Sequence, residues 1–208
     1  MANIIFDFDG TLADTFHIAV SGVRKLALNG RVPTDEEIEE LRNLSALEVM
    51  KALHVSWLQV PKLVYFGRKE VTSKIAGVTT FKGMADTLRK LQDDGHRLFI
   101  ISSNSTKNIK TFLDNNKLGE YFDGYWGDKG LFAKSAALKQ IARKLHLDIK
   151  DCAYVGDEVR DIDAARKAGI RAISVTWGYN NRNALTRAKA GTIIDKPEDL
   201  LELFAARA

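Results

Sequence analysis

Short strand-like runs, most of them rich in apolar residues, alternate along this chain with longer segments in which apolar side chains recur at helical spacing. Such runs predict strands that are buried on both faces of a sheet. They occupy residues 4–6, 98–101, 121–126, 152–155, 171–176 and 192–194. The segments between the later runs carry apolar residues at i, i+3, i+4 and i+7, which predicts helices. Strands that alternate with helices indicate an α/β fold with a doubly wound, parallel, Rossmann-like sheet.

Residues 14–76 interrupt this alternation, because they contain helical patterns only. Two capping boxes and a proline predict where helices begin there. The boxes are Thr34-x-x-Glu37 and Ser45-x-x-Glu48, and the proline is Pro61. We therefore predict an α/β catalytic core, residues 1–13 and 77–208, and a small all-helical cap, residues 14–76, inserted after the first strand.

The composition is ordinary for a soluble globular protein, with 45% hydrophobic and 28% charged residues and a formal net charge of +4. The densest basic stretches, 139–144 and 182–189, alternate with apolar residues at helical spacing. We interpret them as solvated helix faces and expect no nucleic-acid partner. The chain has no N-terminal signal pattern and no apolar stretch near the roughly 20 residues of a membrane span, so we expect a cytoplasmic protein without a membrane partner.

The single cysteine, Cys152, lies in a strand-like run, which predicts a buried thiol and excludes a disulfide within the chain. The four histidines are isolated and show no metal-ligand spacing. Neither residue type therefore points to a reaction.

Two carboxylates directly follow the first apolar run. Asp7 and Asp9 are separated by one residue, and residues i and i+2 of an extended segment project to the same side. Two neighbouring carboxylates repel each other, so a buried pair needs a cation or a shared proton. Helix capping or a turn is the alternative to a chemical role. A Mg²⁺ site fits because this hard cation takes oxygen ligands and leaves positions for phosphate oxygens, and one aspartate then attacks phosphorus.

Further polar residues stand where later strands are predicted to end. Ser103 and Asn104 follow the second run, Lys134 stands at a helix start, and Asp157 and Asp161 follow the run at 152–155. Each has an ordinary alternative: a helix cap, an exposed lysine, a turn or an acid in the first helical turn. Open parallel sheets bind ligands at the carboxyl ends of their strands. The fixed order of these residues therefore favours one convergent site.

The order and spacing of these motifs resemble those of the haloacid dehalogenase-like hydrolases. The matching segments are Asp7-Phe8-Asp9-Gly10-Thr11-Leu12, Ser103, Lys134 and Gly156-Asp157-Glu158-Val159-Arg160-Asp161. Ala168-Gly169-Ile170 and Trp177-Gly178 are similar to the phosphoglycolate phosphatase-like branch. Ser102 is an alternative to Ser103 for the second motif, and Lys129 is an alternative to Lys134 for the third.

The resemblance implies a Mg²⁺-dependent phosphatase that hydrolyses a small phosphorylated metabolite through an aspartyl-phosphate. Asp7 is the implied nucleophile and Asp9 the general acid and base. The implied metal ligands are carboxylates of Asp7 and Asp157 and the backbone carbonyl of Asp9. Because dehalogenases do without an acid at the second position, Asp9 favours phosphoryl transfer.

The same resemblance implies a phosphate site. Ser103 and backbone N–H groups near Asn104 bind phosphate oxygens, while Gly10 and Thr11 allow a tight turn beside them. Lys134 compensates negative charge in the transition state, and Asp161 orients Lys134 or a metal-bound water.

Two alternatives and several details stay open. Phosphomutases share both aspartates, so a β-phosphoglucomutase-like activity is one alternative. A phosphorylated receiver domain is the other, although receivers have no helical insert. The cap is expected to close over the site, with Arg42, Asn43 and Ser45 as substrate contacts. The chain is expected to act as a monomer or a homodimer.

Overall fold

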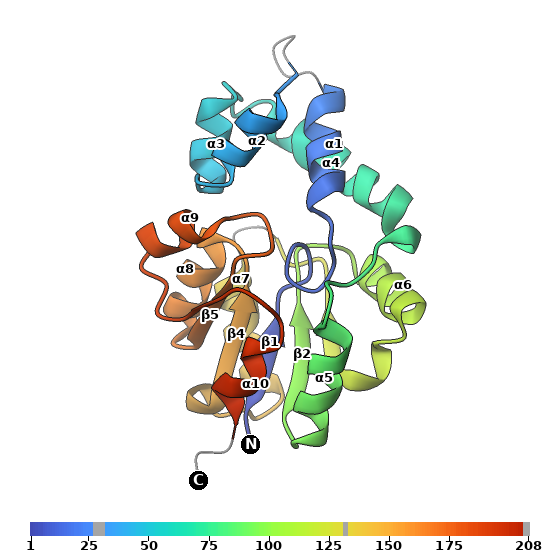
Figure 1. Ribbon diagram of the computed structural model, residues 1–208, viewed down its shortest axis with the longest axis vertical. Helices are drawn as coiled ribbons and strands as arrows, with labels where there is room; N and C mark the ends of the chain where they lie inside the picture. Colours follow the sequence, from blue (N-terminus) through green and yellow to red (C-terminus); the bar gives the residue numbers. More distant parts are fainter. Residues whose placement is uncertain (27–31, 131–132, 206–208) are drawn as a thin grey trace.

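A six-stranded, fully parallel sheet forms the centre of the computed structural model, which describes residues 1–26, 32–130 and 133–205. The strand order is β3-β2-β1-β4-β5-β6, so β1 is central and pairs with both β2 and β4 (Figure 1). The strands are β1 (Asn3–Phe6), β2 (Arg97–Ile101), β3 (Gly124–Trp126), β4 (Cys152–Gly156), β5 (Arg171–Val175) and β6 (Ile193–Ile194). The doubly wound α/β fold is thus confirmed.

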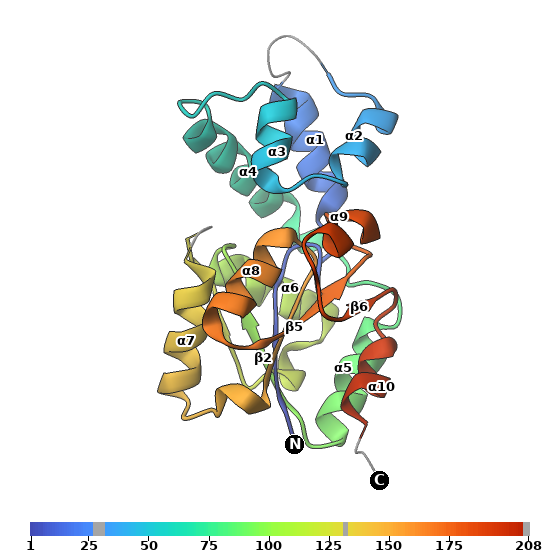
Figure 2. The same ribbon diagram turned by 90° about the vertical axis from the view of Figure 1, so that its left-hand side faces the viewer.

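Helices cover both faces of this sheet (Figures 1 and 2). The core helices are α5 (Met84–Asp93), α6 (Thr106–Asn116), α7 (Lys134–Lys144), α8 (Val159–Ala168), α9 (Arg182–Arg187) and α10 (Asp199–Phe204). Alternate residues of β1 point to opposite faces: Ile4 and Phe6 lie in one apolar cluster with α5, α6 and α10, and Ile5 lies in another with α7 and α8. Cys152 is buried in the second cluster, as predicted.

Between β1 and α5, the described residues form four α-helices that lie together beyond the carboxyl ends of the strands (Figures 1 and 2). They are α1 (Phe16–Leu26), α2 (Asp35–Leu41), α3 (Ala46–Ala52) and α4 (Val60–Lys74). Both capping boxes form, with Thr34 and Ser45 as N-caps. The described part of this insert contains no strand, as the sequence pattern predicts.

The chain enters and leaves the insert at one place. The Asp14 N–H donates to the carbonyl of Thr79 over 3.1 Å, and Ala13 forms an antiparallel bridge with Thr80. The Thr80 hydroxyl donates to the carbonyl of Leu12 over 2.8 Å, which joins the two crossing segments a third time. The insert is therefore connected to the sheet by a narrow double-stranded neck.

The predicted strand at 121–126 is the main difference from the sequence-based expectation. The strand is limited to Gly124–Trp126, and a 3₁₀ turn occupies Gly119–Tyr121. Phe122 lies between them and packs edge-on against Phe6, with ring centroids 6.1 Å apart. Its aromatic ring is therefore packed against the core without belonging to a strand.

Candidate active site

The carboxyl end of β1 delivers Asp7 and Asp9 next to each other. The Asp7 N–H donates to the Val155 carbonyl over 2.8 Å, which continues the pairing of β1 with β4 past the end of the strand. Phe8 points the other way and packs against the Phe112 ring at 5.1 Å. Gly10 then turns the chain with a φ of +76°, a conformation that suits glycine. Both carboxylates are thus held at the point between β1 and β4 where the strand order reverses.

Lys134 is buried at the first residue of α7 and joins two of the predicted acids. Its Nζ donates to Asp7 Oδ2 over 2.5 Å and to Asp161 Oδ1 over 2.6 Å. All three side chains are only 3% exposed, so the ammonium compensates two carboxylates in a nearly water-free place. Lys129 is only partly buried, and no ion pair of its ammonium with a carboxylate is found among the described residues. The geometry favours Lys134 as the lysine of the site.

Asp157 follows β4 and is fully enclosed. Its carboxylate accepts hydrogen bonds from Thr11 Oγ1 at 2.8 Å and from the Tyr179 N–H at 2.7 Å. A Cβ added at Gly10 or at Gly178 would lie 2.3 Å from Asp157 Oδ2. Two glycines therefore leave the space that this carboxylate occupies.

A set of carboxylates in this region suits a hard divalent cation. One oxygen each of Asp7, Glu158 and Asp161 lies within 4.8 Å of the other two. Oxygen donors of this kind are what Mg²⁺ prefers. Glu158 was not among the residues singled out from the sequence, although it stands directly after Asp157. It also accepts hydrogen bonds from Arg160, one of them from Nε over 2.9 Å.

Burial shifts the titration of these acids upward. It raises the pKa of Asp7 to about 7, although Lys134 acts in the opposite direction. It also raises the pKa of Asp9, against the hydrogen bond from Asn104, and it raises the pKa of Asp157 well above the usual range. A bound cation favours ionised carboxylates, so this cluster gains most from a positive charge. Perturbed pKa values of this kind concentrate at functional sites.

The segment after β2 contributes polar groups beside Asp9. Asn104 Nδ2 donates to both carboxylate oxygens of Asp9, over 3.0 and 3.1 Å. Ser102 is buried and its Oγ accepts the Asn104 N–H at 2.9 Å, whereas Ser103 lines a cavity that Asp9 also lines. Of the two candidate serines, Ser103 is therefore the one placed against open space.

This cavity of about 360 Å³ lies between the core and the inserted helices. The core contributes mostly polar residues to its wall, and the insert contributes mostly apolar ones from α3 and α4. The core residues are Asp9, Ser103, Asn104, Glu158, Arg160 and Tyr179. The insert residues are Ala19, Ala46, Met50, Val60, Leu63, Val64, Gly67, Arg68 and Val71.

The predicted substrate contacts Arg42, Asn43 and Ser45 are not among the residues that line this cavity, and the first two instead join the insert to the core. Arg42 Nη2 donates to the Gly178 carbonyl over 2.9 Å, and its guanidinium lies 5.0 Å from the Phe16 ring centroid. Asn43 accepts a 2.9 Å hydrogen bond from Asn181, while Ser45 caps α3.

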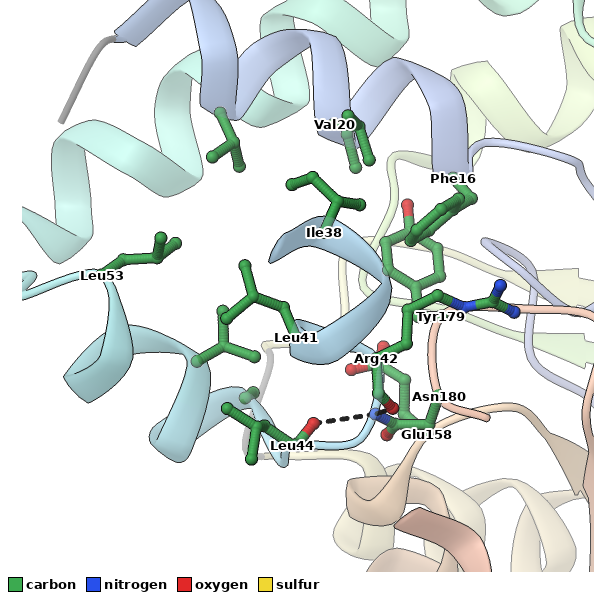
Figure 3. Close-up of a pocket in the computed structure, with 14 residues that line it drawn as sticks. Phe16, Val20, Ile38, Leu41, Arg42, Leu44, Leu53, Glu158, Tyr179 and Asn180 are labelled. Carbon is green, nitrogen blue, oxygen red and sulfur yellow. Dashed lines mark hydrogen bonds between the residues drawn. The ribbon is translucent and has the colours of Figure 1, made fainter. Parts of the chain in front are cut away.

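A second, apolar cavity of about 260 Å³ opens between the inserted helices and the same part of the core (Figure 3). Its walls are mainly the apolar side chains of α1, α2 and α3, and Arg42 borders it. At its edge, Asn180 donates to the Leu44 carbonyl over 2.8 Å (Figure 3). Three consecutive residues of the 42–45 loop thus bond to the segment that follows β5.

Comparison with known proteins identifies the family. The model of the haloacid dehalogenase-like hydrolase family matches residues 4–175. The chain belongs to the haloacid dehalogenase-like hydrolases. A phosphoglycolate phosphatase from Synechococcus elongatus is 34% identical over 97% of this chain and 96% of its own length. Phosphoglycolate phosphatase 1 from Pseudomonas aeruginosa is 28% identical over 95% of this chain and 78% of its own length.

A solved structure of a haloacid dehalogenase-like family hydrolase from Streptococcus pneumoniae has a similar fold, with a TM-score of 0.78 and 26% identity over 98% of each chain. Together these matches place this hydrolase in the phosphoglycolate phosphatase-like branch, and its class of activity is that of a phosphatase. This membership rules out the receiver-domain alternative. Within the described residues, none of the helices is long and apolar enough to cross a membrane.

Proposed function

We propose that this hydrolase is a Mg²⁺-dependent phosphatase that acts on a small phosphorylated metabolite through an aspartyl-phosphate, with 2-phosphoglycolate as the first candidate substrate. The observation that carries the proposal is the buried contact of Lys134 with both Asp7 and Asp161 at the carboxyl ends of β1 and β4. The substrate rests on the similarity to the phosphoglycolate phosphatase of Synechococcus elongatus.

Asp7 is the proposed nucleophile. One of its carboxylate oxygens attacks phosphorus in line, the bond between phosphorus and the ester oxygen breaks, and the phosphoryl group stays on Asp7. Asp9 gives its proton to the leaving oxygen and later takes a proton from the water that hydrolyses the aspartyl-phosphate. The paired hydrogen bonds from Asn104 hold the Asp9 carboxylate in place for both steps.

Lys134, Ser103 and the turn at Gly10 and Thr11 would surround the transferred phosphoryl group. The Lys134 ammonium offsets its growing negative charge, and Asp161 fixes the direction of that ammonium. Ser103 and nearby backbone N–H groups donate to phosphate oxygens. The positions of these side chains at one edge of the sheet support these proposed roles.

The acids at this edge fit a divalent cation. Asp7, Asp157 and the Asp9 carbonyl are the proposed ligands, and Glu158 offers a further oxygen close to Asp7. When bound, Mg²⁺ neutralises the repulsion between a carboxylate nucleophile and a phosphate dianion. Thr11 and Tyr179 orient Asp157 from the protein side.

Residues 14–76 are the proposed cap. Closure of the cap over the cavity would exclude bulk water from the aspartyl-phosphate until the leaving group departs. The loop with Arg42, Asn43 and Ser45 is proposed to bring the cap onto the core and to border the bound substrate. The apolar residues of α4 form the roof of the cavity.

A phosphate-release screen over a metabolite panel, with Mg²⁺ and with chelator, tests the proposal. We expect phosphate release from 2-phosphoglycolate that stops on chelation and returns with Mg²⁺. Asp7→Asn is expected to be inactive, and activity retained in that variant would rule out the nucleophile. A phosphomutase would instead isomerise a sugar phosphate after addition of a bisphosphorylated sugar, with little free phosphate.

A further inference from the structure

The cavity between core and insert carries one arginine from each side, and the two differ in their partners. Arg160, from the core, forms an ion pair with Glu158. Arg68, from α4, donates through Nη2 to the Ser103 carbonyl over 3.0 Å. No carboxylate of the described residues pairs with Arg68. Its positive charge is therefore uncompensated, beside the residue proposed to bind phosphate.

The balance of charges around the cavity indicates what Arg68 could bind. The acids of the site are Asp7, Asp9, Asp157, Glu158 and Asp161, and the cations that contact them are Lys134 and Arg160. With Asp9 protonated as the proposed acid and the other groups ionised, four negative charges face two positive ones, and a divalent cation balances them. The negative charge of a substrate with a second anionic group is then not offset by these groups, so such a substrate needs a further cation.

Most side chains on the opposite wall of the cavity are apolar, among them Met50, Leu63 and Val64. Among the described residues that line this wall, Arg68 is the one that carries a positive charge. A guanidinium has five N–H donors in one plane and binds carboxylates with two parallel hydrogen bonds. The contact with the Ser103 carbonyl keeps it close to the proposed phosphate site, so a short leaving group reaches it.

We infer that Arg68 binds the carboxylate of the leaving group and thereby sets a preference for phosphorylated short carboxylic acids over neutral phosphomonoesters. The inference rests on the proposed function and adds a specificity residue that no motif of the sequence indicated. In 2-phosphoglycolate the carboxylate is attached to the carbon that bears the ester oxygen. Arg68 would thus contact the leaving group near the bond that breaks.

The test compares 2-phosphoglycolate with ethyl phosphate, in which a methyl group replaces the carboxylate. We expect wild-type protein with Mg²⁺ to prefer 2-phosphoglycolate, and Arg68→Gln to lower the ratio of the two kcat/KM values about 10- to 100-fold, mainly through KM. Arg68→Lys should recover part of this ratio. Lys69→Gln is the matched control, because it removes a positive charge from the next, exposed position of the same helix and should leave the ratio unchanged.

The outcomes separate the two proposals. Equal losses on both substrates in Arg68→Gln would mean that Arg68 acts on phosphate or on closure, and would overturn the inference. Equal use of both substrates by wild-type protein would also overturn it, while the phosphatase proposal stands. If wild-type protein hydrolyses neither these substrates nor any other metabolite of the panel, the proposed function fails. Calorimetric binding of both substrates to Asp7→Asn, with and without Arg68→Gln, then decides the role of Arg68 without turnover, because an unchanged affinity ratio would refute it.

Discussion

Replacing Lys134 by methionine would leave the carboxylates of Asp7 and Asp161 buried without the ammonium that both contact, at 2.5 and 2.6 Å. Removal of one partner from a buried ion pair costs about 3–5 kcal/mol, because an uncompensated charge stays behind. For a chain of this length, 1 kcal/mol corresponds to roughly 2–4 °C in Tm. We therefore expect the Tm of Lys134→Met to fall by roughly 6–20 °C in the absence of metal.

The decrease in Tm caused by Lys134→Met should depend on pH and on Mg²⁺. Burial already raises the pKa of Asp7 to about 7, and removal of the lysine raises it further. An aspartate whose pKa is higher in the folded state takes up a proton on folding, so its cost is largest above the folded pKa and fades as the pH falls towards the unfolded value. The Tm difference from wild type should be larger at pH 8 than at pH 5. Added Mg²⁺ should reduce it, because a cation again faces the acids.

Thermal unfolding followed by circular dichroism measures these differences, and phosphate release measures the accompanying loss of turnover. Lys129→Met is the matched control, because Lys129 is the alternative lysine of the third motif and is partly exposed. An unchanged Tm and normal turnover in Lys134→Met would refute the buried contact. Inactivity of Lys129→Met alone would move the catalytic lysine to that position.

Further substitutions test separate parts of the site. Asp9→Asn should lower kcat about 10²–10⁴-fold with little change in KM, as expected for loss of a general acid and base. Ser103→Ala should raise KM roughly tenfold through loss of a hydrogen bond to a charged group, whereas Ser102→Ala should mainly lower stability. Gly178→Ala places a Cβ 2.3 Å from Asp157 Oδ2, so calorimetry should show Mg²⁺ affinity lower by at least about tenfold.

Each of these has a result that contradicts it. Unchanged kcat in Asp9→Asn would remove the acid/base role, and a higher KM in Ser102→Ala alone would reassign the second motif. Gly191→Ala is the control for the glycine, because nothing lies within 4 Å of a Cβ there. Equal Mg²⁺ affinity in Gly178→Ala and Gly191→Ala would contradict the proposal that Asp157 is a metal ligand.

Most strands and the N-caps of α2 and α3 could be predicted, because the residues that determine them lie close together in the sequence. A run such as Cys152–Gly156 is buried on both faces, so its apolar composition alone predicts the strand. Thr34 and Ser45 satisfy N–H groups three residues away, which the capping boxes show directly. The acids after β1 and β4 were predictable for a related reason, since parallel strands end at the same edge.

The missed features depend on contacts between distant segments. Glu158 belongs to the acid cluster because its carboxylate turns towards Asp7, and the residue type does not determine that direction. Arg68 occupies an exposed helical position like those of many solvated arginines, and only the docking of α4 against Ser103 distinguishes it. Arg42 likewise finds its partner, the Gly178 carbonyl, across the boundary between insert and core.

The double-stranded neck at Ala13 and Thr80 separates the inserted helices from the sheet, so the two parts can vary in sequence independently. Strands β1 and β2 are neighbours although Asn3 pairs with Arg97, and the long excursion between them costs little loop entropy once its ends are held together. Insertions or exchanges beyond the neck leave the sheet register untouched. Arg68, the proposed specificity residue, lies in α4 beyond this neck, so substitutions there would alter substrate preference without disturbing the sheet edge that carries the proposed catalytic residues.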